Sequence, residues 1–227
     1  MVPVRDESRP APPLARVVGS SAKPAAGVHV VRAGDTLYSI AWQAGLDFRR
    51  IAQWNRIQSP YLIKPGQRIV LAPHAAPITP NRRAVQPATP PQRTPTPQAQ
   101  SPLGPLKKWV WPADGRVVGR FSPNGGNKGI DIAGPAGAAV RAAAEGRVVY
   151  AGTGLRGYGR LIIVKHNETF LSAYAHNRRM LVEEGQTVGA GQKIAEMGDS
   201  GAKSVKLHFE IRQKGQPVDP LRYLPRI

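Results

Sequence analysis

The sequence predicts a multi-domain protein that combines a small α+β unit with an all-β, antiparallel sandwich. Near the start, apolar residues recur at the three- and four-residue spacing of helices, between two short strand-like runs. Ten prolines then fall within the 33 residues 73–105, a density typical of a linker. Beyond residue 109, short apolar runs are separated by glycine turns without helical periods, which favours an antiparallel sandwich.

Composition limits the function classes. The chain has 227 residues, with 32 Lys and Arg against 14 Asp and Glu and a formal charge of +18. Basic residues outnumber acidic ones in every segment of the chain. This distribution is more typical of a molecule that adheres as a whole to a polyanion or an acidic surface than of one that reads DNA through a localised patch. No recognition helix, aromatic platform or RNA module is evident, so we expect no nucleic-acid partner. The absence of cysteine excludes disulfides, thiolate zinc sites and thiol nucleophiles.

Two segments are expected to lack a folded core. Residues 1–27 are interpreted as a flexible N-terminal tether, and they lack the basic flank and apolar stretch of an export signal. Residues 73–108 contain no acidic residue and too little apolar surface to fold, so we predict a disordered, proline-rich linker. In polyproline II, at about 3.1 Å per residue, that linker would reach on the order of 110 Å. No apolar run approaches the roughly 20 residues of a membrane helix, so we expect a soluble chain without a signal or lipobox.

Residues 28–72 form the first predicted domain, with the element order β-α-α-β. Asp35 or Thr36 would cap the first helix, because each can accept a hydrogen bond from an unpaired N–H of the first turn. Gly45 would end that helix in a left-handed conformation. The elements are expected at residues 28–31 (strand), 37–44 (helix), 48–54 (helix) and 68–71 (strand).

This unit resembles a LysM domain throughout, through residues 30–37 (VVRAGDTL), Asn55 and residues 63–69 (IKPGQRI). The resemblance implies binding of N-acetylglucosamine-containing glycans, chiefly peptidoglycan, in a groove between two loops. Short polar side chains and backbone amides would meet the hydroxyl and acetamide groups above an apolar floor. The alternative is that Gly34 and Asp35 serve only as turn and cap. The predicted peptidoglycan-binding residues are Gly34, Asp35, Thr36, Leu37, Ser59, Pro60, Tyr61, Leu62 and Ile63.

Residues 109–227 form the predicted sandwich. In residues 206–211 polar and apolar side chains alternate, so Lys206, His208 and Glu210 share one face of a strand. Strands are expected at residues 115–118, 146–150, 161–164, 170–174 and 207–211.

This second domain resembles the M23 (LytM, lysostaphin-like) peptidases. Their zinc site is written His-x-x-x-Asp, then Tyr-x-His, then His-x-His on one strand. Carried over by position, the resemblance places metal ligands at Asn127, Asp131 and His208 and proton-handling groups at His176 and Lys206. One ligand and one catalytic residue of the family are therefore replaced.

The two replacements predict a site without metal, cofactor or catalytic residue. Asn127 offers a neutral amide oxygen, a poor exchange for imidazole on zinc. Lys206 brings a fixed positive charge toward a site meant for a dication. We expect the Lys206 ammonium to pair with Asp131 and to take over part of the electrostatic role of the metal. The alternative is that Lys206 points into solvent.

The order of LysM domain, proline-rich linker and degenerate M23 domain resembles the NlpD branch of murein hydrolase activators from end to end. The resemblance implies a non-catalytic activator of a periplasmic zinc-dependent N-acetylmuramoyl-L-alanine amidase, typically AmiC, that splits septal peptidoglycan in cell division. It also implies the periplasm, at the inner leaflet of the outer membrane, through a lipidated N-terminal Cys that this sequence does not contain. The partner is expected to dock in a groove formed by Asn127, Asp131, Tyr174, His176, Lys206 and His208.

Two further functions remain open from the sequence. One is an active zinc metalloendopeptidase that cleaves peptidoglycan cross-bridges or stem peptides and tolerates Asn127 and Lys206. The other is a passive wall anchor in which the degenerate domain is only a spacer.

Overall fold

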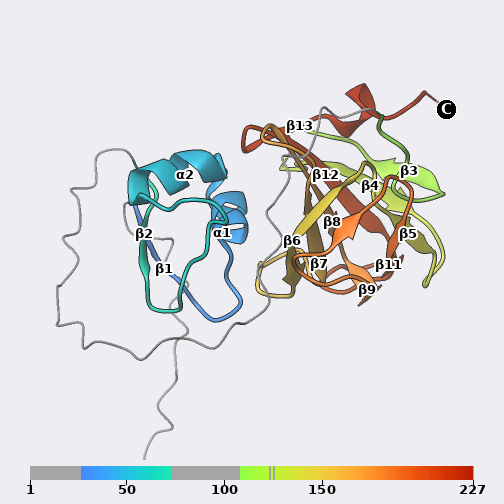
Figure 1. Ribbon diagram of the computed structural model, residues 1–227. Helices are drawn as coiled ribbons and strands as arrows, with labels where there is room; N and C mark the ends of the chain where they lie inside the picture. Colours follow the sequence, from blue (N-terminus) through green and yellow to red (C-terminus); the bar gives the residue numbers. More distant parts are fainter. Residues whose placement is uncertain (1–26, 73–107, 123, 125, 227) are drawn as a thin grey trace, which may run out of the picture.

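The computed structural model describes residues 27–72, 108–122, 124 and 126–226 (Figure 1). All but the last residue of the predicted tether, and all but the last residue of the predicted linker, lie outside these residues. None of the helices in the described part is long and apolar enough to cross a lipid bilayer.

The smaller unit, residues 27–72, has the predicted β-α-α-β order. Strands β1 and β2 pair antiparallel, with Val28 opposite Val70. The helices pack against this pair through buried apolar side chains such as Ile40 and Ile51. The elements are β1 (Val28–Val30), α1 (Leu37–Ala44), α2 (Phe48–Asn55) and β2 (Arg68–Val70).

Local hydrogen bonds explain where α1 begins and ends. Thr36 is the N-cap, since its hydroxyl accepts the Ser39 N–H while the Ser39 hydroxyl accepts the Thr36 N–H. Asp35, the other predicted cap, instead accepts hydrogen bonds from the His29 ring and the Arg32 N–H. Gly45 ends the helix with φ 67°, a left-handed conformation that favours glycine.

The larger unit, residues 108–226, is a sandwich of two antiparallel sheets (Figure 1). The large sheet runs β10-β6-β7-β8-β12-β4-β3, with β13 also paired to β12. The small sheet runs β5-β11-β9. This architecture confirms the predicted fold class. The strands of the large sheet are β3 (Arg116–Gly119), β4 (Ile130–Ala133), β6 (Gly146–Gly152), β7 (Leu161–Lys165), β8 (Phe170–Ala175), β10 (Thr187–Val188), β12 (Leu207–Gln213) and β13 (Gln216–Val218). Those of the small sheet are β5 (Ala139–Arg141), β9 (Asn177–Met180) and β11 (Lys193–Met197), and a 3-10 turn, η1 (Pro220–Arg222), follows β13.

The two faces of the large sheet are buried in different ways. Side chains such as Ile132, Phe209 and Ile211 face the small sheet and form the core of the sandwich with Val140 and Ile194. The opposite face carries a second apolar group that joins the core of the smaller unit in one continuous cluster. That group comprises Val149, Tyr150, Leu155, Leu161, Ile163, Leu171, Ala173 and Ala175. The large sheet is therefore covered on both faces over part of its area.

Candidate functional site

Two neighbouring strands place the polar residues of the candidate site. β12 pairs antiparallel with β4, which puts His208 directly opposite Asp131. Lys206 immediately precedes β12, and its backbone N–H donates to the Gly198 carbonyl, which aligns it with the strand. Because side chains alternate along β12, Lys206, His208, Glu210 and Arg212 project from the same face as Asp131. These five residues are called the ion network below.

Asp131 is held between two cations. The Lys206 ammonium donates to one carboxylate oxygen at 2.9 Å, and His208 Nδ1 donates to the other at 2.8 Å. The Lys206–Asp131 pair expected from the sequence is therefore present. The alternative of a lysine directed into solvent is wrong, because the Lys206 side chain is only 26% exposed.

The pairing shifts both pKa values toward the charged forms. Burial alone would raise the pKa of the Asp131 carboxyl, but the hydrogen bonds from His208 and Lys206 outweigh it and lower the pKa to about 2. Burial likewise opposes a charge on His208, yet the Asp131 and Glu210 carboxylates raise the pKa of its imidazole to about 9. His208 is thus a cation at neutral pH.

Glu210 extends the network below the surface. Its side chain is 1% exposed, and one carboxylate oxygen accepts hydrogen bonds from the Tyr158 hydroxyl at 2.7 Å and from His208 Nε2 at 3.2 Å. The other oxygen accepts two hydrogen bonds from the Arg212 guanidinium. Burial would raise the pKa of Glu210, but the bonds from His208 and the charge of Arg212 lower it. Glu210 is therefore an ionised carboxylate whose two oxygens are both engaged.

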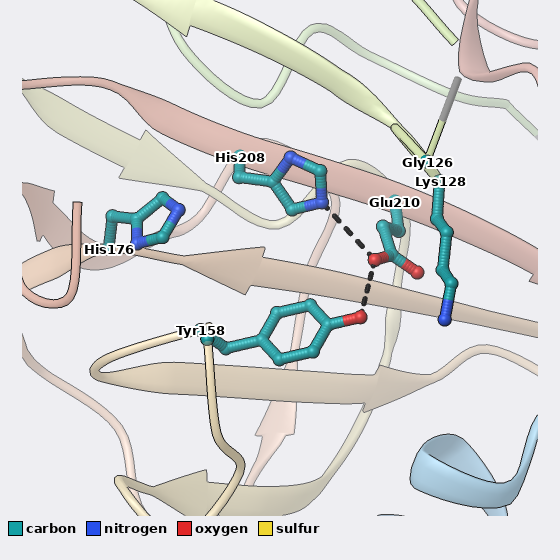
Figure 2. Close-up of a pocket in the computed structure, with 7 residues that line it drawn as sticks. Gly126, Lys128, Tyr158, His176, His208 and Glu210 are labelled. Atoms are coloured by element: carbon teal, nitrogen blue, oxygen red, sulfur yellow. Dashed lines mark hydrogen bonds and ion pairs between the residues drawn. The ribbon is translucent and has the colours of Figure 1, made fainter. Parts of the chain in front are cut away.

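A pocket of about 280 Å³ opens over His208 and Glu210 of this network (Figure 2). His176 lies on its other side, immediately after β8, and its Nδ1–H donates to the Ser200 carbonyl at 2.8 Å. Burial lowers the pKa of His176, so the ring is neutral at physiological pH and keeps a lone pair on Nε2. The pocket is lined by Gly126, Lys128, Gly157, Tyr158, His176, His208 and Glu210.

The structure gathers only part of the predicted groove. Asp131, Lys206 and His208 share hydrogen bonds, and the rings of His176 and His208 lie 6.1 Å apart. Asn127 is half-buried, and its side-chain oxygen accepts the Gly129 N–H at 3.2 Å within its own turn.

The prediction for Tyr174 is wrong. This residue is fully buried between the two sheets, where its ring packs on Phe209 and its hydroxyl accepts the Ala143 N–H. Alternation along β8 turns Ala173 and Ala175 to the pocket side of the sheet and Tyr174 to the core.

Five pocket residues were not among the predicted groove residues, two of them the glycines Gly126 and Gly157. Glu210 could have been included, because it shares the face of Lys206 and His208. Lys128 lies within the glycine-rich turn before β4, beside two predicted positions. Tyr158 reaches the pocket from a loop and lies 52 residues from Glu210 in sequence, so no local pattern places it there.

Zinc, which the M23 resemblance implies, does not suit this donor set. Imidazole binds zinc through an unprotonated nitrogen, and both nitrogens of His208 donate to carboxylates. The ammonium of Lys206 contacts the Asp131 carboxylate that would be a ligand, and the amide oxygen of Asn127 is already engaged. Within the part of the chain that is described, no three His, Asp or Glu side chains are grouped as a metal would need.

The predicted glycan loops of the smaller unit differ in accessibility. Gly34, Ser59 and Pro60 are exposed, and Leu62 is 79% exposed. Leu37 has no exposed surface, because it is the first buried residue of α1, so its side chain does not reach the surface of this loop.

Comparisons with known proteins agree with both units. The model of the LysM domain matches residues 29–72, and that of peptidase family M23 matches residues 125–220. A Pseudomonas aeruginosa protein named lipoprotein NlpD/LppB homolog is 49% identical, over 88% of this chain and 77% of the relative. The murein hydrolase activator NlpD of Salmonella typhimurium is 42% identical, over 87% of this chain and 68% of the relative. The outer membrane antigenic lipoprotein B of Haemophilus influenzae is 39% identical, over 98% of this chain and 69% of the relative.

Proposed function

This chain belongs to the NlpD family, and on that premise we propose that it is a non-catalytic activator of a cell-wall hydrolase. The hydrolase is a periplasmic N-acetylmuramoyl-L-alanine amidase of the AmiC kind, which splits septal peptidoglycan at division. The proposed site of action is the periplasmic side of the cell envelope, in keeping with relatives that are named lipoproteins.

The observation that carries the proposal is the ion network. Hydrolysis by an M23 site requires a Lewis acid and an activated water, but here Asp131 is neutralised by Lys206 and His208. Both nitrogens of His208 are committed to carboxylates, so it is not available as a metal ligand. What remains is a preorganised, charged pocket that can bind a protein segment without cutting it.

The amidase is proposed to dock over this pocket. Asp131, His176, Lys206 and His208 would contact it, with Asn127 at the rim. A binding partner shifts a conformational equilibrium only when it prefers one of the states. The pocket must therefore bind the amidase more tightly in its active form than in its inhibited form.

The smaller unit is proposed to bind peptidoglycan, with residues 28–72 as one domain and residues 109–227 as the other. The contacts would come from the exposed loop residues around Gly34 and Leu62. Holding the activator on the wall raises its effective concentration near the amidase without adding a catalytic contact.

The test measures dye release from labelled peptidoglycan by a purified amidase, with and without the full chain. Wild type should stimulate release, and Lys206→Glu should abolish stimulation because it places a carboxylate beside Asp131. Binding to peptidoglycan sacculi should remain unchanged. Lys193→Glu is the matched control, since it makes the same charge change on β11 of the small sheet and should leave stimulation intact.

Two results would contradict the proposal. Clearing of a peptidoglycan gel by this chain alone with added zinc would support a zinc endopeptidase. Binding to sacculi without any stimulation of an amidase would support a passive wall anchor.

A further inference from the structure

The two units of the protein are in direct contact. Helix α1 lies on the side of the smaller unit that faces the larger one (Figure 1). Its apolar side chains, with those of α2, form one continuous cluster with residues of β6, β7 and β8 on the pocket-side face of the large sheet. The smaller unit therefore covers the face of the sheet from which the ion network projects.

Arg212 joins the pocket to this contact. Its guanidinium is 1% exposed and stacks on the Trp42 ring at 3.6 Å from the ring centroid. One nitrogen donates to the Trp42 carbonyl at 2.6 Å, and two others donate to Glu210. Since Trp42 belongs to α1, the Arg212 end of the ion network is buried beneath this helix, while its neighbour Glu210 lines the pocket.

A second cation anchors the other side of the contact. Lys165, at the end of β7, places its ammonium 5.0 Å from the Phe48 ring centroid, 5.8 Å from that of Tyr61 and 6.0 Å from that of Tyr38. The three rings contact one another edge to face or at a tilt. The Lys165 side chain is only 13% exposed, and its ammonium also pairs with Glu168 of its own unit at 2.5 Å.

Two half-buried rings beside the loops proposed to bind glycan, those of Tyr38 and Tyr61, lie at this same contact. Tyr61 belongs to the loop of residues 59–63, and burial raises the pKa of its hydroxyl. Tyr38 follows the loop of residues 34–37, and burial raises its pKa further. Asp35 lies close enough to Tyr150 of the large sheet to raise the pKa of that phenol in addition to the effect of burial.

We propose that this contact is an autoinhibitory latch in which the smaller unit covers the Arg212 end of the ion network and holds Tyr38 and Tyr61, beside its glycan loops, against the larger unit, and that peptidoglycan binding opens it. The inference rests on the proposed function, since it assumes that these loops bind glycan and that the pocket serves the amidase. A glycan chain and Lys165 compete for the ring surface of Tyr61. Opening then exposes Arg212 and the apolar strip of β7 and β8 to the amidase.

The composition of the contact suits a reversible closure. It contains two cations, Arg212 and Lys165, whose charges pack on aromatic rings. Interfaces between domains of one chain resemble transient protein–protein interfaces, and relative motion of the domains is common across them.

The β12–β13 turn provides a way to open the latch without altering the pocket. Lys214 and Gly215 both have positive φ in a two-residue turn. A Cβ at Gly215 would lie 2.4 to 2.5 Å from backbone atoms of Leu46 and Asp47 in the smaller unit. Gly215→Asn keeps a residue that tolerates positive φ but cannot coexist with the closed contact.

Gly191→Asn is the matched control. Gly191 has φ 77° in another turn of the larger unit, close to the 81° of Gly215, and a Cβ there would meet nothing within 4 Å. The two variants share the same local backbone cost, so only the clash with the smaller unit separates them.

Three quantities are measured on the full chain. The first is the rate at which an acylating reagent modifies the Lys165 amine, read by mass spectrometry. The others are the affinity for chitotetraose, a soluble N-acetylglucosamine tetramer, and the stimulation of amidase dye release. Gly215→Asn should raise Lys165 reactivity and chitotetraose affinity by about fivefold over Gly191→Asn, as for a binding-competent form populated at about one fifth. Stimulation of the amidase should rise with them, and saturating chitotetraose should raise Lys165 reactivity in wild type.

The outcomes separate this inference from the proposed function. If wild type binds chitotetraose but Lys165 reactivity is equal in both variants and unchanged by chitotetraose, the latch is refuted while the glycan function stands. Protection of Lys165 by chitotetraose would also refute it, because glycan would then favour closure. If no variant binds chitotetraose or sacculi, the glycan function and the latch are overturned together, and the binding measurements identify that case directly.

Discussion

At the scale of single residues, Asp131 organises the pocket. One carboxylate accepts hydrogen bonds from Lys206 and His208, and the second nitrogen of His208 reaches Glu210. Each carboxylate therefore lies between two cations, and cations occupy both ends of the row. Such a network is costly to break, because removing one partner leaves another charge unpaired below the surface.

Replacement of Lys206 by methionine tests that cost. Lys206→Met keeps the aliphatic length and removes the ammonium, so Asp131 retains only His208. We expect the free energy of unfolding to fall by about 1–3 kcal/mol, measured by chemical denaturation of the full chain. Lys193→Met removes a lysine that is 42% exposed and should change stability by less than about 0.5 kcal/mol. Equal effects of the two changes would mean that the Lys206–Asp131 pair contributes nothing.

The pH dependence of stability isolates His208. Its pKa of about 9 in the folded protein exceeds the ordinary value of 6.5, so the folded state holds a proton that the unfolded state loses first. This stabilisation is fully present below about pH 6.5 and is lost as the pH rises through 9, with an upper value of about 3 kcal/mol. Denaturation of wild type and His208→Gln at pH 6.5, 8 and 9 should show this decline only in wild type.

Neither His166 nor His176 changes the pH dependence of stability between pH 6.5 and 9. Burial lowers the pKa of His166 to about 4, and burial also lowers that of His176. Their contribution to stability is therefore lost as the pH falls below 6.5, on the opposite side of the window. A decline of equal size in His208→Gln would assign the effect to another group.

At the scale of elements, Asn55 holds the smaller unit together. Its side-chain amide donates to the Val70 carbonyl and to the Ile51 carbonyl, and its oxygen accepts the Val70 N–H at 2.7 Å. One side chain thus joins the end of α2 to β2. The smaller unit has only one pair of short strands, so it depends on such links between its elements.

Asn55→Ala should destabilise the smaller unit by about 2–3 kcal/mol, because it leaves backbone groups of Val70 without partners. Gln53→Ala changes an exposed residue of the same helix and should be nearly neutral. Hydrogen exchange at the Val70 amide, compared between the two variants, reports this loss directly. Unchanged protection of Val70 in Asn55→Ala would show that the β1–β2 pairing alone suffices.

The sequence could predict elements whose periodicity is strong. Helical spacing and the signals at Thr36 and Gly45 located α1, and alternation in β12 placed Lys206 and His208 on one face. The small sheet was not anticipated, because β5, β9 and β11 are short and rich in Ala, Arg and Lys. Such strands are defined by pairing and burial more than by their own propensity.

Tyr174 and Arg212 show why the site could be only partly predicted. A motif gives the position of a residue in the chain, but a shift of one residue along a strand reverses the face of the sheet that the side chain occupies. Tyr174 accordingly points into the sandwich core, whereas its neighbours Ala173 and Ala175 point to the pocket side. Arg212 contacts Trp42 across 170 residues of sequence. No local pattern in α1 or in β12 predicts this contact.

At the scale of the whole molecule, the positive charge bears on how the protein meets the cell wall. The formal charge of +18 on 227 residues attracts any surface that carries carboxylates. Peptidoglycan offers both carboxylates, on its peptide stems, and neutral sugar units. Two contributions to wall binding are therefore expected, one from general electrostatic attraction and one from the glycan loops.

Salt separates these two contributions. Between 0.1 M and 1 M NaCl the screening length falls from about 10 Å to about 3 Å, so binding to sacculi should weaken by about tenfold or more. Binding of uncharged chitotetraose to the same chain should change by less than about twofold, because its contacts are hydrogen bonds and apolar surface at short range. Sedimentation with sacculi and calorimetric titration with chitotetraose measure the two affinities. If sacculi binding is insensitive to salt, the distributed charge has no part in wall attachment. If chitotetraose binding falls in parallel, the glycan loops depend on charge rather than on the shape and polarity of the sugar.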